Sequence, residues 1–272
     1  MITALDHVAV AVGDFGAAVE GYRRLLGREP ELEPRDGAER AWFHLANAAL
    51  EVIGPYGEGA AGDRVRARLE AEGEGVWLVA FQVRDLEADA RLIERRGLPV
   101  ERVGAVARTA AAGIDIVLTA GREGAQSSPA NGEETAAIPA LDHVVMRTAN
   151  IDRAVANFGG RLGLDLRLDR ANPGWGARQL FFKCGDAVVE FAASLKAPVS
   201  DGPDSFGGLA WRTADPDAVH ARLAAAGFNV SELRTGRKPG TKVFTIRDAP
   251  AGVPTIVLTA EPLVSNSMAE PA

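Results

Sequence analysis

The chain contains two copies of one sequence pattern, and this internal repeat restricts the possible folds more than any other feature. The segment LDHVAVAV begins at Leu5, and a related segment, LDHVVMRT, begins at Leu141. Further segments match at similar spacings: 37–52 with 176–191, 79–100 with 209–230, and two IVLTA segments that begin at Ile116 and Ile256. Repeats of this length can each bury a core, so we expect two tandem domains with one fold.

The repeat also sets the expected domain boundaries. The first domain should occupy residues 1–121 and the second residues 140–262. Residues 122–139 are rich in small and polar side chains, which is typical of a linker. Residues 263–272 are expected to form a loose tail.

Each half divides again into two smaller units, in which a strand is followed by a helix and then by more strands. The helices are indicated by capping residues at their ends. Asp14 and Gly27 mark the start and end of the first helix, and Asp85 and Gly97 those of the second. The third begins at Asn150 or Asp152, and its last turn is weakened by Gly159 and Gly160. The fourth begins at Asp215-Pro216 and ends at Gly227. A short extra helix is expected within 62–73. The sequence therefore predicts an α+β fold in which each domain is a pair of strand-helix-strands modules.

Composition excludes several classes of protein. The net charge is −7, so no basic surface indicates nucleic-acid binding. The single cysteine, Cys184, cannot form an intramolecular disulfide and is expected to be a small core or cavity residue. The N-terminal segment does not resemble a signal peptide, and no apolar run approaches the ~20 residues of a membrane span. We expect a cytoplasmic monomer or homodimer whose partner is a small molecule.

Side chains alternate between the two faces of a strand, and this alternation places two histidines and two glutamates on the faces that their own helices do not cover. In LDHVAVAV the three valines share the face that suits the following helix, so His7 faces the other way. The same alternation turns His143, Glu51 and Glu190 away from their helices. If residues 46–47 form a tight hairpin turn, Trp42 and His44 share the face of Glu51, and Lys183 shares that of Glu190.

This pattern resembles the vicinal oxygen chelate superfamily, which includes glyoxalase I, methylmalonyl-CoA epimerase, extradiol dioxygenases and bleomycin-resistance proteins. The resemblance rests on LDHV at His7 and His143, on ALEV at Glu51 and on VVEF at Glu190. It implies paired βαβββ modules whose curved mixed sheets form cups. It also implies a divalent metal ion (Zn, Ni, Mn, Co or Fe) bound by these four residues, with Glu51 and Glu190 as catalytic bases of a lyase or isomerase.

Four positions depart from the family pattern. Leu78 and Gly208 stand where the family places a second histidine, and Val117 and Val257 stand where it places a second glutamate. If the modules pair in the usual way, each cup receives one histidine and one glutamate, with His44 as a candidate third ligand in the first cup and a charged Lys183, which cannot bind metal, in the second. A four-ligand site would need the first and third modules to face each other.

These departures leave three functions open. The first is the metal-dependent lyase or isomerase. The second is a metal-free binding protein of the bleomycin-resistance type, with a hydrogen-bonded His–Glu pair in each cup. The third, less favoured, is an extradiol dioxygenase.

Strand alternation further predicts substrate-binding residues. Arg147 and Arg212 should lie on the face of His143, with Lys183 nearby, so that the second cup binds an anionic ligand. In the alternative interpretation both arginines reach solvent at the strand ends. The matching positions of the first cup are Ala11, Gln82 and His44, so we expect a less charged ligand there, or none, with Trp42 and His44 as contacts.

The segment GEGAAG (57–62) fits the glycine pattern of dinucleotide-binding loops. However, two residues separate it from the preceding strand, and that strand is expected to be a hairpin partner. The spacing therefore favours a plain turn over a nucleotide site.

Overall fold

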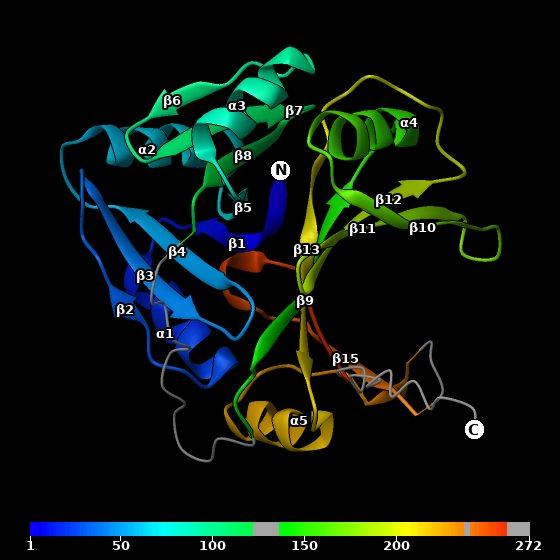
Figure 1. Ribbon diagram of the computed structural model, residues 1–272. Helices are drawn as coiled ribbons and strands as arrows, with labels where there is room; N and C mark the ends of the chain where they lie inside the picture. Colours follow the sequence, from blue (N-terminus) through cyan, green and yellow to red (C-terminus); the bar gives the residue numbers. More distant parts are fainter. Residues whose placement is uncertain (122–135, 237–239, 260–272) are drawn as a thin grey trace, which may run out of the picture.

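The computed structural model describes residues 1–121, 136–236 and 240–259. The expected tail lies entirely outside the described residues, and so does most of the expected linker. The described chain forms two sheets, one from each half of the sequence. In Figure 1 the first half lies on the left, in blue to green, and the second half extends over the right and the bottom.

The first sheet has eight strands in the order β2-β3-β4-β1-β5-β8-β7-β6. β1 pairs with β4 in parallel and with β5 in antiparallel orientation, so the sheet is mixed and β1 and β5 join its two modules. The strands are β1 (Ile2–Ala11), β2 (Glu31–Leu32), β3 (Ala38–His44), β4 (Ala49–Pro55), β5 (Gly75–Val83), β6 (Glu101–Val103), β7 (Val106–Ala111) and β8 (Ile114–Thr119). The helices are α1 (Phe15–Leu26), α2 (Ala60–Glu72) and α3 (Leu86–Arg95).

The second sheet repeats this order as β10-β11-β12-β9-β13-β16-β15-β14. Its strands are β9 (Ala140–Arg147), β10 (Asp165–Asn172), β11 (Ala177–Cys184), β12 (Ala187–Ser194), β13 (Ser205–Thr213), β14 (Arg234–Thr235), β15 (Lys242–Ile246) and β16 (Thr255–Thr259). Its helical segments are α4 (Ile151–Ala154), the π-helix Val155–Arg161, α5 (Pro216–Ala225) and the short η3 (Pro250–Gly252). The predicted α+β fold of two tandem domains, each a pair of modules, is confirmed.

The predicted caps begin the helices. The carboxylates of Asp14, Asp85 and Asp215 each accept a hydrogen bond from the backbone three residues later. Asn150 does the same for α4. The weak turn expected at Gly159-Gly160 is part of the π-helix that continues α4, which fits the low helix propensity of glycine.

The helix sides of both sheets share one continuous hydrophobic core, which includes the valines of β1 and the large aromatic residues of the second half. The halves also join through α1 and α5 at the bottom of Figure 1, where Arg222 donates hydrogen bonds to the carbonyls of Arg24 and Leu25. The opposite sheet faces point away from this core. We call them the first cup face, which carries His7, and the second cup face, which carries His143.

Candidate functional site

His7 and Glu51 form a nearly buried pair on the first cup face. Parallel pairing sets Glu51 beside Ala9, and Nε2 of His7 lies 3.5 Å from Oε2 of Glu51. Nδ1 of His7 lies 2.7 Å from Oδ1 of Asp6, so the imidazole is held from both sides. Nε of Arg40 lies 3.1 Å from Oε1 of Glu51. The pair is therefore fixed by its neighbours, and the charge of Glu51 has a cationic partner.

The second cup face repeats this arrangement with one change. Nε2 of His143 lies 3.4 Å from Oε2 of Glu190, and Nδ1 lies 2.7 Å from Oδ1 of Asp142. The side chain of Gln179 donates a 2.5 Å hydrogen bond to Oε1 of Glu190. Gln179 occupies the position on β11 that corresponds to Arg40 on β3. Because Gln179 is uncharged, the carboxylate of Glu190 is held by a neutral side chain at the position where Glu51 has a cation.

Sequence reasoning missed the four residues that hold these pairs, namely Asp6, Arg40, Asp142 and Gln179. A signal was available, because an aspartate precedes the histidine in both copies of LDHV. Arg40 and Gln179 lie on the strand next to each glutamate, two positions before the residue directly opposite it.

The other residues predicted around the first pair lie where strand alternation placed them. Trp42 is opposite Glu51, and its ring meets the His7 ring edge-on at 5.0 Å. Trp42 also stacks on His44 at 6.4 Å. Both side chains are buried, and Nε2 of His44 lies 3.1 Å from a carboxylate oxygen of Glu31. They form one wall beside the His7–Glu51 pair.

The opposite wall of the first cup face is apolar at the two positions where the family places metal ligands. Leu78 pairs with Ala9 on β1, and Val117 pairs with Ala80. These four side chains form a small buried hydrophobic cluster. None of these four side chains can complete a coordination shell begun by His7 and Glu51.

Position 208 cannot hold a side chain in the observed backbone. Gly208 pairs with Val145 and has φ of 143°, a conformation that favours glycine. A Cβ atom at this position would overlap the carbonyl oxygen of Pro254. The family histidine is therefore excluded by backbone geometry.

The expectation that Val257 faces the second cup was wrong. Val257 pairs with Trp211 and is buried in the helix-side core. Ile256, which pairs with Ala210, takes the cup-facing position instead. The two IVLTA segments are thus offset by one residue in their sheets, so aligning their letters gave the wrong face.

The two histidines and two glutamates are not assembled into one site. Each sheet holds its own pair, because the first module pairs with the second and the third with the fourth. Among the described residues there is no group of three or more His, Cys, Asp or Glu that could hold a metal ion. Catalytic zinc normally has three protein ligands. The residues of either cup therefore do not fit a resident divalent metal.

The predicted cluster of cations on the second cup face does not form. Arg147 lies opposite Ser205, whereas Arg212 lies opposite Ala140 at the other end of β9. Seven residues of strand separate them, roughly 23 Å. Arg212 is ion-paired with Asp186, and Lys183 is exposed. This fits the alternative in which the arginines reach solvent at the strand ends.

The extra helix expected within 62–73 is α2, and it covers one end of the first cup face. Its residues Ala61 and Val65 pack against Ala11, Ala38 and Ile53. The GEGAAG segment forms the turn before this helix and its first three residues. Gly59 and Gly62 pass so close to the backbone of residues 36–37 that no side chain would fit at either position. The carboxylate of Asp36 accepts 3.0 Å hydrogen bonds from the amides of residues 60 and 61. It occupies the position that a phosphate would need, so a nucleotide site is not supported.

Asp36 should therefore stabilise α2. Replacing Asp36 by alanine removes two hydrogen bonds at the start of the helix and should lower the free energy of unfolding by about 1 kcal/mol. Chemical denaturation measures this loss. The control is Asp63→Ala, which removes an exposed carboxylate on the same helix and should cost less than half as much. Equal losses in the two variants would contradict the capping role.

Cys184 is buried, as expected for a core residue. Burial raises the pKa of its thiol from 9.0 to about 12. Near neutral pH the native protein should therefore react with a disulfide reagent about a thousandfold more slowly than the unfolded chain. A fast native reaction, followed spectroscopically, would show that the thiol is accessible.

The same pKa shift makes the free energy of unfolding depend on pH. Because the pKa of the Cys184 thiol is raised in the folded state, its contribution to stability is complete below pH 9 and is lost as the pH rises toward 12.

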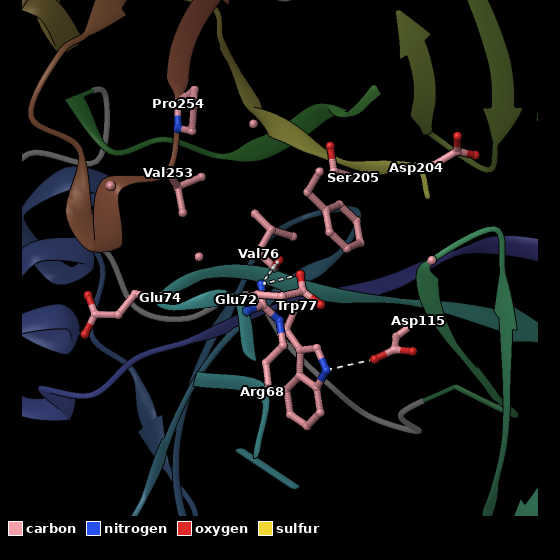
Figure 2. A pocket seen from close by; sticks show the side chains of 15 residues that line it. Arg68, Glu72, Glu74, Val76, Trp77, Asp115, Asp204, Ser205, Val253 and Pro254 are labelled. Carbon is pink, nitrogen blue, oxygen red and sulfur yellow. Dashed lines mark hydrogen bonds and ion pairs between the residues drawn. The ribbon is translucent and has the colours of Figure 1, made fainter. Parts of the chain in front are cut away.

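Two cavities adjoin the first cup face. One, of about 480 Å³, is lined by residues that include Arg64, Arg108, Trp77, Leu78 and Val117. This volume is typical of small-molecule sites. The other, of about 190 Å³, lies between the two halves and is shown in Figure 2. It is smaller than ordinary ligand sites, so the larger cavity is the better candidate.

Comparisons with known proteins agree with this architecture. A sequence model described as "Glyoxalase/Bleomycin resistance protein/Dioxygenase superfamily" matches residues 6–125 and 142–245. Ethylmalonyl-CoA/methylmalonyl-CoA epimerase of Cereibacter sphaeroides is 34% identical over 104 residues, which cover 37% of this chain and 75% of that protein.

Solved structures show the same fold at low sequence identity. A variant of 4-hydroxymandelate synthase from Streptomyces coelicolor has a TM-score of 0.73 and 13% identity, with 96% of this chain and 94% of that chain covered. The Mn(II)-bound glyoxalase from Novosphingobium aromaticivorans has a TM-score of 0.67 and 18% identity, with 95% and 82% covered. Separately, no helix within the described ranges is long and apolar enough to cross a membrane.

Proposed function

Because the chain belongs to the glyoxalase/bleomycin resistance protein/dioxygenase superfamily, we propose that it binds a small oxygen-rich or anionic metabolite on its first cup face without a resident metal ion. The observation that carries this proposal is the apolar wall of Leu78 and Val117 opposite His7 and Glu51. Two protein ligands are too few for a firm metal site. The cavity beside this wall has the volume of a small-molecule site.

The residues around the first pair have distinct roles in this proposal. His7 offers a ring nitrogen whose orientation is fixed by Asp6, and it can hydrogen-bond an oxygen of the ligand. Trp42 and His44 provide a flat wall for packing. The second sheet, with Glu190 held by Gln179 and position 208 restricted to glycine, has a structural role or binds a different ligand.

A lyase or isomerase is the second candidate, and the sequence similarity to an epimerase favours it. Such a reaction moves a proton to and from carbon, which needs a base and an acid on the cup face. In the first sheet Glu51 would be the base, and His7, at 3.5 Å, would exchange the proton with it. Glu190 and His143 would act in the same way in the second sheet.

Metal analysis tests the proposal. Untagged protein, produced in medium supplemented with Zn, Ni, Mn, Co and Fe salts, should contain far less than one equivalent of any of these metals by mass spectrometry. Dialysis against EDTA should leave the melting temperature unchanged. A stoichiometric metal that falls in both His7→Ala and Glu51→Ala would contradict metal-free binding and favour the enzyme.

A further inference from the structure

Two arginines on the first cup face have no ion-pair or hydrogen-bond partner for their side chains among the described residues. Arg64 lies on α2 and Arg108 on β7, directly opposite Val117. The Nε atom of each is buried without a hydrogen bond, and within the described part of the chain neither side chain has an ion pair. Both side chains are half-buried. A buried Nε–H without an acceptor is costly, so a cavity that contains two such groups is suited to a ligand that supplies acceptors.

A third arginine adds to the positive charge at this site. Arg40 reaches the same face from β3 and is already paired with Glu51. Burial lowers the pKa of Arg108, and the nearby charges of Arg64 and Arg40 lower it further. The three guanidinium groups come from separate segments of the first half and are close enough to repel one another.

The acidic residues around this cavity do not neutralise Arg64 and Arg108. Asp115 accepts a 2.9 Å hydrogen bond from the indole of Trp77, which Figure 2 shows directed at it. Glu72 lies 3.5 Å from Arg68. Glu101 lies opposite Arg108 on the edge strand β6, and its charge raises the pKa of Arg108. Its side chain is exposed, and among the described residues it forms no ion pair or hydrogen bond with Arg108 or Arg64.

We propose that Arg64 and Arg108 bind the carboxylate or phosphate group of an anionic ligand, whose apolar part lies against Trp77, Leu78 and Val117. Guanidinium groups bind both kinds of anion through paired hydrogen bonds. The apolar cluster that replaces the family's metal ligands then serves as the packing surface for the remainder of the ligand. This inference deepens the proposed function by naming the ligand class of the same cup face. It replaces the expectation that the first cup takes a less charged ligand or none, because that expectation compared only Ala11, Gln82 and His44 and did not include Arg64 and Arg108.

Binding of small probes in EDTA-containing buffer tests this site. The probes are malonate, inorganic phosphate and malonamide, a neutral analogue of malonate of similar size. Malonate or phosphate should raise the melting temperature and bind in calorimetric titrations, whereas malonamide should do neither. A preference for malonate identifies a carboxylate ligand, and a preference for phosphate identifies a phosphorylated one.

Three variants assign the binding to these arginines. Arg64→Gln and Arg108→Gln should each weaken the preferred anion at least about tenfold, the usual effect of losing one charge-assisted hydrogen bond. The control, Arg66→Gln, removes an arginine of the same helix that is paired with Asp63, and binding should be unchanged. Binding of the anion to all four proteins with equal affinity would overturn the proposal, and so would equal stabilisation of the wild type by malonamide.

The stability of the ligand-free variants separates binding from structure. If Arg64 and Arg108 are kept for a ligand, their replacement by glutamine should leave the melting temperature unchanged or raise it, because a half-buried charge without an ion-pair partner is removed. A marked fall in both variants would mean that the arginines support the fold, and the proposal would fail. Anion binding that depends on these arginines but also requires added metal would reject the proposal of metal-free binding and retain the anion site.

Discussion

Replacing Gly208 by alanine should lower the free energy of unfolding by about 3 kcal/mol. The backbone at this position has φ of 143°, which is strained for any residue with a side chain, and the added Cβ would overlap the carbonyl oxygen of Pro254. That carbonyl accepts a 2.9 Å hydrogen bond from the amide of Leu209, so it cannot move without loss. Each of these effects costs about 1–3 kcal/mol.

Gly207→Ala is the matched control. Its added Cβ would meet side-chain atoms of Val145 and Arg147 and no backbone atom, and its φ is not in the positive range. Equilibrium denaturation should therefore show a much smaller loss than for Gly208→Ala. If the two variants are equally stable, position 208 accepts side chains and the geometric exclusion of a histidine from the second cup is wrong.

The double substitution Leu78→His and Val117→Glu should give the first cup face a metal site. Both positions lie on the face of His7 and Glu51, so four ligands would surround one space. We expect affinity for Zn²⁺ or Mn²⁺ to rise at least about a hundredfold over the wild type, since even outer-shell partners of metal ligands change affinity by about 10–100-fold. Titration with a competing chelator measures the change.

The control for this gain is Leu78→Gln with Val117→Gln, which adds polar groups of similar size but poorer metal ligands. It should bind metal no better than the wild type. If the wild type bound metal as tightly as we expect of the Leu78→His, Val117→Glu variant, two protein ligands per cup would be enough to hold the ion. The account of the apolar wall would then be wrong.

Much of the fold follows from local rules that act within short segments. The helix caps at Asp14, Asp85 and Asp215 depend only on residues a few positions away. Strand alternation turned His7 and Glu51 to one face without any knowledge of distant contacts. These features repeat in both halves, which made the module organisation predictable.

The parts of the site that sequence reasoning missed depend on contacts between distant segments. Arg40 and Arg108 belong to β3 and β7, which the sheet order places on one face, and the folding of α2 over that face adds Arg64. The expected cations of the second cup share a face by alternation, yet they lie at opposite ends of β9, because alternation gives the face and not the register. Val257 shows the same limit, since a one-residue offset reverses the face of a strand residue.

The most direct test of the account is a crystal structure of the EDTA-treated protein grown with malonate. We predict density for the dicarboxylate beside Arg64 and Arg108, with its carbon chain against Trp77 and Leu78, and a direct contact between His7 and Glu51 without an ion between them. Malonate bound only on the second cup face, or a metal ion bridging His7 and Glu51 despite the chelator, would contradict it.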